Sequence, residues 1–231
     1  MTTKHSLSVV IPTYNASSIL ENCYSSLKEA TSHFPITEVI VVDAHSTDDT
    51  VAVAESLGAK VIGSERGRGI QLDAGARVAM GSWILFIHAD TALQTDWATE
   101  AVQFIKDPKS AYRGAVFRFR LDDHGIAAQL LEQLVALRCR ILALPYGDQA
   151  LLLRRSFYHA LGGFLPIPIM EDVDLVRRIG RKKLTYLRSY AVTSSQRYKE
   201  RGYLLRMARN VLCLALYFLG ISPRIIHNLY Q

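Results

Sequence analysis

Cysteines are few in this chain of 231 residues, and no apolar run reaches the length of a membrane span. The three cysteines, Cys23, Cys139 and Cys213, are odd in number and far apart, which excludes a disulfide framework and the paired spacing of a zinc site. The apolar run 211–221 is too short for a spanning helix, which needs about 20 apolar residues. No apolar signal-peptide core follows the first residues. We therefore expect a cytoplasmic protein, in contact at most with the inner face of the membrane.

Acidic residues are almost absent from the C-terminal part of the sequence. From Leu175 onward, twelve lysines or arginines stand against a single acid, Glu200, and the whole chain carries a formal charge of +6. Such a basic end suggests phosphates, anionic lipids or nucleic acid as partners, although a solvated basic face is the commoner explanation. Nucleic acid is not among the partners we predict. With 49% hydrophobic and 21% charged residues, the composition is that of one globular domain.

Strand and helix patterns alternate through the N-terminal part of the chain. The expected strands are 7–11, 38–42, 60–63 and 83–91, and the expected helices run from 15–18 to about 30, from 50 to 57 and from 70 to 79. Alternation of this kind predicts a parallel sheet with right-handed crossovers. A nucleotide is the natural ligand of such a sheet, at the carboxyl ends of its strands.

The stretch from Trp83 to Thr91 is an apolar run that stops at a histidine and a carboxylate. Its residues suit a strand buried on both faces. Because side chains alternate along an extended chain, His88 and Asp90 would point to the same side, and a hard cation on Asp90 could neutralise a diphosphate. The alternative is that Asp90 only begins a turn or caps a helix that starts near Asp96.

The first loop lacks the fingerprint of a dinucleotide site. A Rossmann site would need Gly-x-Gly-x-x-Gly between the first strand and the first helix, where this chain reads Pro-Thr-Tyr-Asn-Ala-Ser. Instead, Asp43 and Asp90 stand at the ends of separate strands, and Arg68 lies between two glycines. A strand-end carboxylate can accept a hydrogen bond from a nucleobase or a ribose, and an arginine can bind phosphate. We predict that these three residues form a nucleotide site.

Several short motifs, in order, make the sequence resemble the family 2 glycosyltransferases of the GT-A fold. They occupy residues 9–16, 41–50, 69–75, 83–90, 161–164 and 171–175. The resemblance implies an α/β fold, a Rossmann-like and mostly parallel sheet flanked by helices, over residues 1–200. Residues 201–231 would form a helical C-terminal extension, packed on the domain or on a membrane surface. The strings His-Ala-Asp-Thr, Tyr-Gly-Asp-Gln-Ala and Pro-Ile-Met-Glu-Asp-Val-Asp-Leu are most similar to a small bacterial branch associated with radical-SAM/selenodomain proteins.

The family resemblance implies transfer of a sugar from a nucleotide diphosphate sugar, with UDP-sugar favoured, to an unidentified acceptor hydroxyl, usually with inversion. Asp43 would bind the base through N3–H of uracil, and a divalent metal, Mn²⁺ or Mg²⁺, would be held by Asp90 and His88. His88 stands where the family commonly has the first acid of Asp-x-Asp, so metal dependence is less direct than Asp90 alone would indicate. The other donor residues that the resemblance implies are Pro12, Tyr14, Asn15, Arg68 and Asp73.

On the acceptor side, the resemblance makes Asp172 the general base, with Glu171 as a neighbouring acid that raises its basicity. The acid-rich segment 171–175 has a plainer explanation as a helix N-terminus, where the helix dipole favours acids. Asp148 and Gln149 could bind the acceptor hydroxyl, or could only end a helix predicted at 126–145 and order its loop. Arg197 and Tyr198 resemble, weakly, the Gln-x-x-Arg-Trp acceptor-site signature of processive relatives.

The C-terminal segment 203–220 leaves three interpretations open. It could lie in a membrane interface with its arginines on anionic headgroups, which would fit a lipid-linked acceptor; it could be a buried helix on the sheet; or it could form a homodimer contact. Two other functions also remain. A nucleotidyltransferase normally has its glycine-rich loop after the first strand, whereas Gly67-Arg68-Gly69 follows the third; a nucleotide-sugar-binding protein without transferase activity would not need Asp172.

Overall fold

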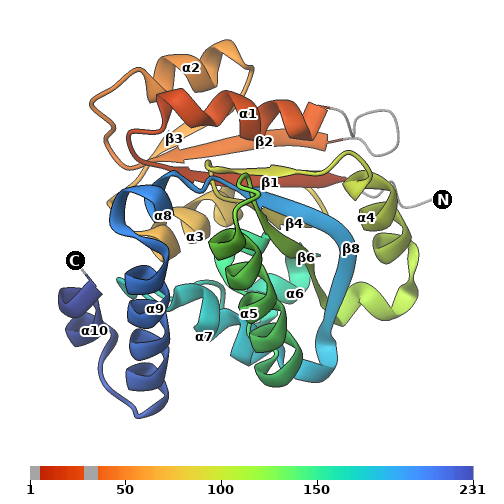
Figure 1. The fold of residues 1–231 in the computed structure, drawn as a ribbon. Helices are drawn as coiled ribbons and strands as arrows, with labels where there is room; N and C mark the ends of the chain where they lie inside the picture. The colour runs from red at the N-terminus through yellow and green to blue at the C-terminus, as the bar shows by residue number, and fades with distance from the viewer. Residues whose placement is uncertain (1–5, 29–35, 231) are drawn as a thin grey trace.

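The computed structural model describes residues 6–28 and 36–230, which form one eight-stranded sheet covered by helices (Figure 1). The strands are β1 (Leu7–Thr13), β2 (Ile36–Asp43), β3 (Lys60–Gly63), β4 (Trp83–Phe86), β5 (Thr91–Leu93), β6 (Gly114–Leu121), β7 (Leu151–Arg154) and β8 (Leu184–Thr193). The helices are α1 (Ser17–Lys28), α2 (Thr50–Ser56), α3 (Arg68–Val78), α4 (Trp97–Lys106), α5 (Ile126–Leu142), α6 (Arg155–Ala160), α7 (Glu171–Ile179), α8 (Gln196–Arg201), α9 (Tyr203–Phe218) and α10 (Pro223–Tyr230). Short 3-10 helices are η1 (Pro108–Tyr112), η2 (Gly147–Gln149) and η3 (Arg181–Lys183).

The strand order is β3-β2-β1-β4-β7-β6-β8-β5, and the two halves of the sheet differ. In the first half β3, β2, β1 and β4 are parallel, as the alternation of strands and helices predicts. In the second half β7 runs antiparallel to both β4 and β6, β8 is parallel to β6, and β5 closes the edge antiparallel to β8. The sheet is thus mostly parallel where the sequence motifs are densest and mixed beyond β4.

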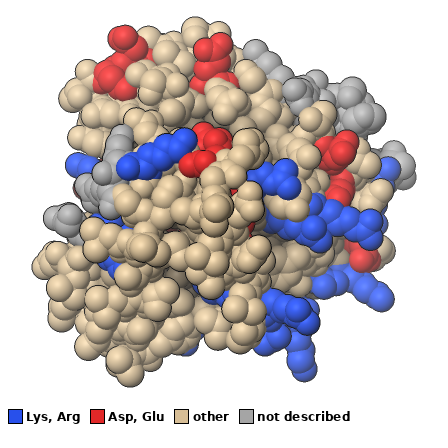
Figure 2. All heavy atoms as spheres, viewed as in Figure 1, with Lys and Arg blue, Asp and Glu red and all other residues tan. Residues whose placement is uncertain are grey.

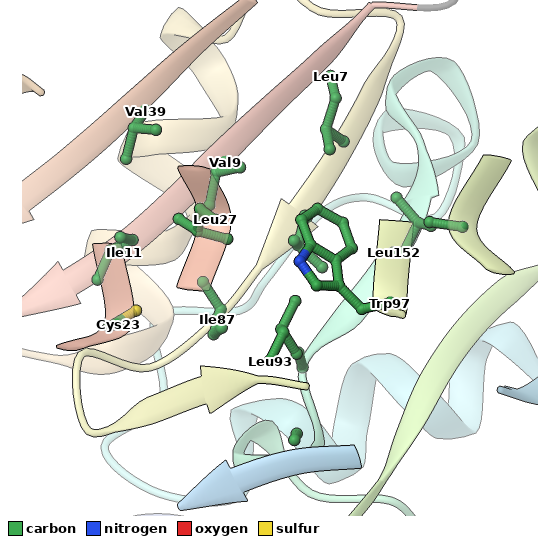
Figure 3. Packing of buried hydrophobic residues seen from close by; sticks show 14 of the residues in the cluster. Leu7, Val9, Ile11, Cys23, Leu27, Val39, Ile87, Leu93, Trp97 and Leu152 are labelled. Atoms are coloured by element: carbon green, nitrogen blue, oxygen red, sulfur yellow. The ribbon is translucent and has the colours of Figure 1, made fainter. Parts of the chain in front are cut away.

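Apolar layers cover both faces of the sheet, which explains why its inner strands are continuous apolar runs. Alternate residues of β1 serve the two layers: Val9 packs with α1 and α4, while Val10 packs with α3 and α7. Trp97 of α4 is fully buried and lies among side chains from β1, β4 and β7 in the first layer (Figure 3). In the second layer Gly75 of α3 lies so close to β1 that an added Cβ would be 2.4 Å from Cγ1 of Val10.

Two predicted elements end earlier than the sequence pattern indicates. The strand predicted at 83–91 stops at Phe86, and a turn follows in which the Thr91 amide donates to the carbonyl of His88 over 3.1 Å. The argument that extended-chain alternation aims His88 and Asp90 is therefore wrong. The helix predicted at 126–145 ends at Leu142, because the next residue, Ala143, takes a left-handed conformation with φ of 52°.

The first two strands are longer than predicted, and one boundary is not described. β2 runs from Ile36 to Asp43, where the sequence pattern predicts a strand at 38–42. β1 continues through Pro12 to Thr13, which a proline tolerates because pairing with β4 stops at Val10 and leaves that side of β1 without a partner strand. The predicted end of the first helix, near residue 30, lies outside the described residues.

The C-terminal helices pack on the second apolar layer. Cys213 and Leu214 of α9 and Ile226 of α10 are buried in the same cluster as Val173 and Val176 of α7. Helix α9 also lies beside α5 and α10. None of the helices in the described part of the chain has the length and apolar content to cross a bilayer.

Candidate active site

Two neighbouring cavities open at the carboxyl ends of β1 and β4. The first, which we call the β1 cavity, has a volume of about 490 Å³ and is lined mainly by the loop after β1, the start of α3 and the turn after β4. The second, the α9 cavity, has a volume of about 100 Å³ and lies between that turn, η2, the start of α7 and helix α9. Arg68, His88 and Asp90 line both cavities, so they mark where the two meet.

Three residues predicted for the donor site form one wall of the β1 cavity: Pro12 near the end of β1, and Tyr14 and Asn15 in the loop after it. Tyr14 is 42% exposed, and the guanidinium of Arg66 stacks over its ring at 4.0 Å from the centroid. Asn15 has a left-handed conformation with φ of 49°, and its Oδ1 accepts from the backbone amide of Thr47 over 2.9 Å. This contact fixes the loop after β1 against the loop after β2.

Asp43 lies at the end of β2 and is 5% exposed. Its carboxylate accepts hydrogen bonds from the Thr13 hydroxyl at 3.0 Å and from the Ser46 amide at 2.8 Å. Thr13 itself lines the β1 cavity, and Gln71 of α3 holds the carbonyl of Thr13 over 2.8 Å. Asp43 thus sits directly behind the cavity wall, where it ties the ends of β1 and β2 together.

An ion pair joins the start of α3 to the start of α7. Nε of Arg68 lies 2.8 Å from Oε1 of Glu171, and the Glu171 side chain is 2% exposed. Burial raises the pKa of Glu171; Arg68 opposes the rise and the adjacent Asp172 adds to it. Gly69 permits this approach, since an added Cβ would lie 2.5 Å from the carbonyl oxygen of Leu165.

Gly147 of η2 lies between Asp172 and His88, a residue of the turn after β4. The Gly147 amide donates to Oδ2 of Asp172 over 2.7 Å, and the amide of Val173 donates to Oδ1 over 2.7 Å. A Cβ on Gly147 would be 2.6 Å from Nε2 of His88 and 3.6 Å from Oδ2 of Asp172. The imidazole and the carboxylate therefore flank one glycine, and the α7 N-terminus adds a dipole that favours the carboxylate.

The side chains of Asp148 and Gln149 lie in different environments, although the residues are adjacent in the sequence. Asp148 lines the α9 cavity, and its buried Oδ1 has no hydrogen-bond partner among the described residues. Burial raises the pKa of Asp148 to about 6, with Arg138 opposing the rise and Asp172 adding to it. Gln149 is 2% exposed, and its amide nitrogen donates to the carbonyl of Phe117 over 2.9 Å, so its polar atoms serve the packing of α5 on β6.

Three further predicted residues have different outcomes. Asp73 is not brought to either cavity: its carboxylate accepts from the Tyr158 hydroxyl over 2.8 Å and from Nε of Arg77 over 2.7 Å. Tyr198 is buried and lines the α9 cavity, stacked on Tyr203 with ring centroids 5.4 Å apart. The side chain predicted at position 197 lies outside the described residues.

The C-terminal helices supply cavity residues that the sequence motifs do not mark. Arg206, Asn210 and Cys213 of α9 line the α9 cavity, and His227 of α10 lines the β1 cavity. The first three are spaced i, i+4, i+7, which places them on one face of a helix. That spacing is a signal in the sequence, because it sets a polar strip into an otherwise apolar segment.

A divalent metal fits the residues where the two cavities meet. Among the described residues no group of three or more His, Cys, Asp or Glu side chains could hold an ion by itself. Mg²⁺ and Mn²⁺ sites that act on phosphates commonly use one or two protein ligands and complete the shell with phosphate and water. Asp90, beside His88 and open to both cavities, meets that requirement.

Comparison with known proteins identifies the family of the chain. The model of the family described as Glycosyl transferase family 2 matches residues 8–163. An uncharacterised glycosyltransferase of Rickettsia conorii is 34% identical over 116 residues, which cover 50% of this chain and 39% of the relative. A PGL/p-HBAD biosynthesis glycosyltransferase of Mycobacterium tuberculosis is 27% identical over 179 residues, which cover 72% of this chain and 66% of the relative. The chain thus spans less than two thirds of either relative.

Solved structures share the fold at low identity. Glucosyl-3-phosphoglycerate synthase from M. tuberculosis, solved with UDP and Mn²⁺, has a TM-score of 0.66 and 21% identity, covering 94% of this chain and 81% of that one. S. aureus TarS, solved with UDP-GlcNAc, has a TM-score of 0.63 and 20% identity, covering 81% and 58%. A Pyrobaculum calidifontis mannosyltransferase, solved with GDP-Man and Mn²⁺, has a TM-score of 0.60 and 20% identity, covering 88% and 59%. These likenesses confirm the predicted GT-A-like fold.

Proposed function

Because the chain belongs to glycosyl transferase family 2, we propose that it transfers a sugar from a nucleotide diphosphate sugar to an acceptor hydroxyl, with inversion at the anomeric carbon. One observation carries the proposal: Asp90 and Asp172 line the same α9 cavity, and Asp90 also lines the β1 cavity. A nucleotide in the β1 cavity then has its diphosphate beside Asp90 and its sugar directed toward Asp172.

The proposed donor is a UDP-sugar. Pro12, Tyr14 and Asn15 form the wall that would hold the nucleoside, and Tyr14 offers a ring face for the base. A carboxylate has about four acceptor positions. Asp43 already accepts three hydrogen bonds, from the Thr13 hydroxyl and from the amide and hydroxyl of Ser46, which leaves one position for N3–H of uracil. Two of the solved neighbours contain UDP or a UDP-sugar, which supports this base, while GDP-Man in the third makes GDP the rival to test.

Asp90 is the proposed metal ligand, with His88 as a second ligand or a phosphate contact. Mn²⁺ or Mg²⁺, when bound there, would neutralise charge on the departing diphosphate. Arg68 stands at the same junction and contributes a fixed positive charge, because its ion pair with buried Glu171 orients the guanidinium.

Asp172 is the proposed general base. Its carboxylate would take the proton of the acceptor hydroxyl while that oxygen attacks the anomeric carbon from the face opposite the leaving diphosphate. The hydrogen bonds from the amides of Gly147 and Val173 hold the carboxylate in one orientation for this step. Glu171 is buried in its ion pair with Arg68, so we assign it to positioning Arg68 rather than to proton transfer.

The acceptor side of the cleft includes the C-terminal helices. Asp148, Tyr198, Arg206 and Asn210 surround the space next to Asp172, so we propose that the segment 201–231 belongs to the active unit. The similarity of the His-Ala-Asp-Thr and Tyr-Gly-Asp-Gln-Ala strings to the branch associated with radical-SAM/selenodomain proteins narrows the relatives in which to look for the acceptor, without naming it.

Binding of nucleotides with and without Mn²⁺ tests the proposal. We expect UDP and UDP-sugars to raise the melting temperature and to give calorimetric heats in the presence of Mn²⁺, because a ligand that binds only the folded state stabilises it by mass action. Asp90→Ala should abolish the metal-dependent part. The matched control is Asp96→Ala, an exposed acid at the start of α4 that lines neither cavity and should bind as the wild type does.

Three outcomes would contradict the proposal in different ways. If neither UDP nor GDP nor their sugars bind, the donor assignments at Asp43, Arg68 and Asp90 fail together. If a UDP-sugar binds but is neither transferred nor hydrolysed, and Asp172→Asn changes nothing, the chain is a nucleotide-sugar-binding protein. If a nucleoside triphosphate and a sugar phosphate yield pyrophosphate, the reaction is nucleotidyl transfer.

A further inference from the structure

Helix α5 exposes an apolar stripe. Ile126, Leu130, Leu134, Leu137 and Ile141 are spaced i, i+4, i+8, i+11 and i+15, which places them on one side of the helix, and their exposed fractions run from 42% to 87%. The opposite side of α5 is buried on β6. A stripe of five large apolar side chains on an exposed helix face marks an interaction site more often than chance exposure does.

Helix α9 carries a second apolar strip beside the first. Its exposed apolar side chains are Leu204, Leu205, Val211, Leu212, Phe218 and Leu219. The other side of the same helix presents Arg206, Asn210 and Cys213 to the α9 cavity, so α9 is a wall with the cavity on one side and this strip on the other. Figure 2 shows that the surface over α5, α9 and α10 is almost entirely free of charge. We call the exposed apolar side chains of α5 and α9 named above the apolar face.

Basic side chains border the apolar face at the ends of its helices. Arg181 donates to the carbonyls of Ile141 and Arg140 over 2.9 and 3.1 Å at the end of α5, and Lys182 follows it. The guanidinium of Arg177 lies 5.1 Å from the ring centroid of Phe218 at the end of α9. The side chains of Arg140 and Lys182 are themselves exposed, so positive charge gathers at the border of the apolar face beside the end of α5.

We propose that the apolar face docks on the surface of a lipid bilayer that contains anionic lipids. Apolar side chains lying in the interface and basic side chains on the headgroups are the two contributions that bind interfacial helices to such surfaces. A second copy of the chain is a poorer occupant, because a symmetric contact would bring the two positive borders together. The geometry is that of helices lying along a membrane surface, with the α9 cavity directly behind them.

Docking on a membrane also indicates the class of the acceptor. This inference rests on the proposed transferase function. Helix α9 carries exposed apolar side chains on one side and Arg206 and Asn210 of the α9 cavity on the other. A hydroxyl carried on a lipid headgroup would therefore reach Asp172 along the edge of this helix. The substrate class that fits is a lipid-borne acceptor with a polar head at the bilayer surface.

Vesicle sedimentation tests docking without any substrate. We expect the full chain to sediment with vesicles of phosphatidylcholine mixed with phosphatidylglycerol, to bind far less to phosphatidylcholine alone, and to be released by salt, because the charge contribution is screened. The double variant Leu137→Gln with Leu212→Gln should weaken binding on the order of tenfold, since two apolar side chains no longer enter the interface. The matched control, Met80→Gln with Tyr112→Gln, changes two exposed apolar residues elsewhere and should bind as the wild type does.

A second pair of variants tests the positive border. Arg140→Gln with Lys182→Gln should weaken binding to the anionic vesicles roughly 30-fold at low salt, since each basic residue near the surface contributes about 1 kcal/mol. Lys106→Gln with Lys109→Gln removes the same charge from α4 and η1, away from the apolar face, and should have a much smaller effect. The melting temperature should stay close to that of the wild type in all four variants, which shows that they are folded without reference to the proposed transferase function.

Other results would overturn the proposal. Absence of sedimentation with the anionic vesicles, or equal loss in the control pairs, excludes docking through this face. If sedimentation velocity instead shows a dimer that Leu137→Gln with Leu212→Gln dissociates, and vesicles are not bound, the apolar face joins two copies of the chain.

Discussion

The two cavities of the cleft are built by different means. The β1 cavity rests on the ends of parallel strands, and its walls are tied by short backbone contacts such as those of Asn15 and Gln71. The α9 cavity has η2 and the end of β8 on one side and helix α9 on the other. Two acids, Asp148 and Asp172, line it beside Asp90. One side of the cleft is therefore a scaffold of strand ends, whereas the other is a concentration of carboxylates held by loops and helices.

This difference indicates which side of the cleft recognises the donor and which side carries out proton transfer. A site made of strand ends and backbone groups suits a ligand that is recognised by fixed hydrogen bonds, as a nucleoside is. Converging carboxylates in a partly buried space suit proton transfer, because neighbouring acids and burial alter one another's proton affinity. If the comparison is right, changes in the α9 cavity alter turnover and leave donor binding intact, while changes behind the β1 cavity do the reverse.

Asp172→Asn is expected to have the largest effect. Losing the general base should lower the transfer rate by about 10²–10⁴-fold, because the acceptor hydroxyl then loses its proton without help. The amide keeps the shape of the carboxylate, so UDP-sugar affinity in calorimetry should change less than about twofold. Asp174→Asn, two residues along α7 and paired with Arg178 outside the cavities, is the matched control. Loss of donor binding in Asp172→Asn would remove the distinction between the two cavities.

Gly147→Ala should come next, because this glycine joins the two sides of the site. The new methyl group would lie 2.6 Å from Nε2 of His88, so the imidazole or the η2 loop must move. A displacement on this scale costs about 10²-fold in turnover when reacting groups depend on position. Gly63→Ala has open space around its Cβ and serves as the control. Wild-type turnover in Gly147→Ala would mean that the position of His88 relative to Gly147 and Asp172 has no role in the reaction.

The sequence predicts the strand-end side of the cleft much better than the other side. The strand at 60–63 matches β3 residue for residue, and the helices that follow the first three strands lie where their caps and glycines indicate. Parallel strands buried on both faces must be apolar runs bounded by turn residues, so their pattern is local and readable. The early end of β4 escapes this reading, because Ile87 is as apolar and as buried as the strand before it.

The α9 cavity depends on contacts that no local pattern encodes. Asp172 and Asp148 carry motif signals, but the separate fate of Gln149 follows from its bonds to Phe117 and Cys139, which only the packing of α5 on β6 creates. Arg206 of α9 reaches the cavity because a helix far along the chain folds back beside α5. Such long-range packing has no counterpart in sequence spacing, apart from the polar strip on α9.

Protonation of Asp148 in the α9 cavity should have an effect of intermediate size on the free energy of unfolding. The pKa of Asp148 is raised by burial to about 6, from an ordinary value of 3.8, so between these values the folded state binds more protons than the unfolded state. The free energy of unfolding should therefore fall as pH rises through this window, by about 3 kcal/mol in total. Asp148→Asn should flatten that fall in urea unfolding measured across the window, whereas Asp96→Asn should not. An unchanged slope in Asp148→Asn would place the titrating group elsewhere, with Glu171 as the next to examine.

Asp73→Ala should have the smallest effect. It tests whether Asp73 serves the stability of the fold rather than donor binding. The family resemblance places Asp73 with the donor, yet its carboxylate accepts a hydrogen bond from the hydroxyl of Tyr158, a fully buried residue of α6. Removing it should cost about 1 kcal/mol in the free energy of unfolding, since the hydroxyl loses a charged partner but keeps its bond from the Phe164 amide. Tyr158→Phe should cost more, because it also removes the acceptor of the Phe164 amide. The double variant should cost little more than Tyr158→Phe alone, because both changes break the bond between Asp73 and Tyr158. UDP affinity should stay within about twofold of the wild type. If affinity instead falls tenfold while stability is unchanged, Asp73 belongs to the donor site after all, and the wall of the β1 cavity extends further along α3 than its lining indicates.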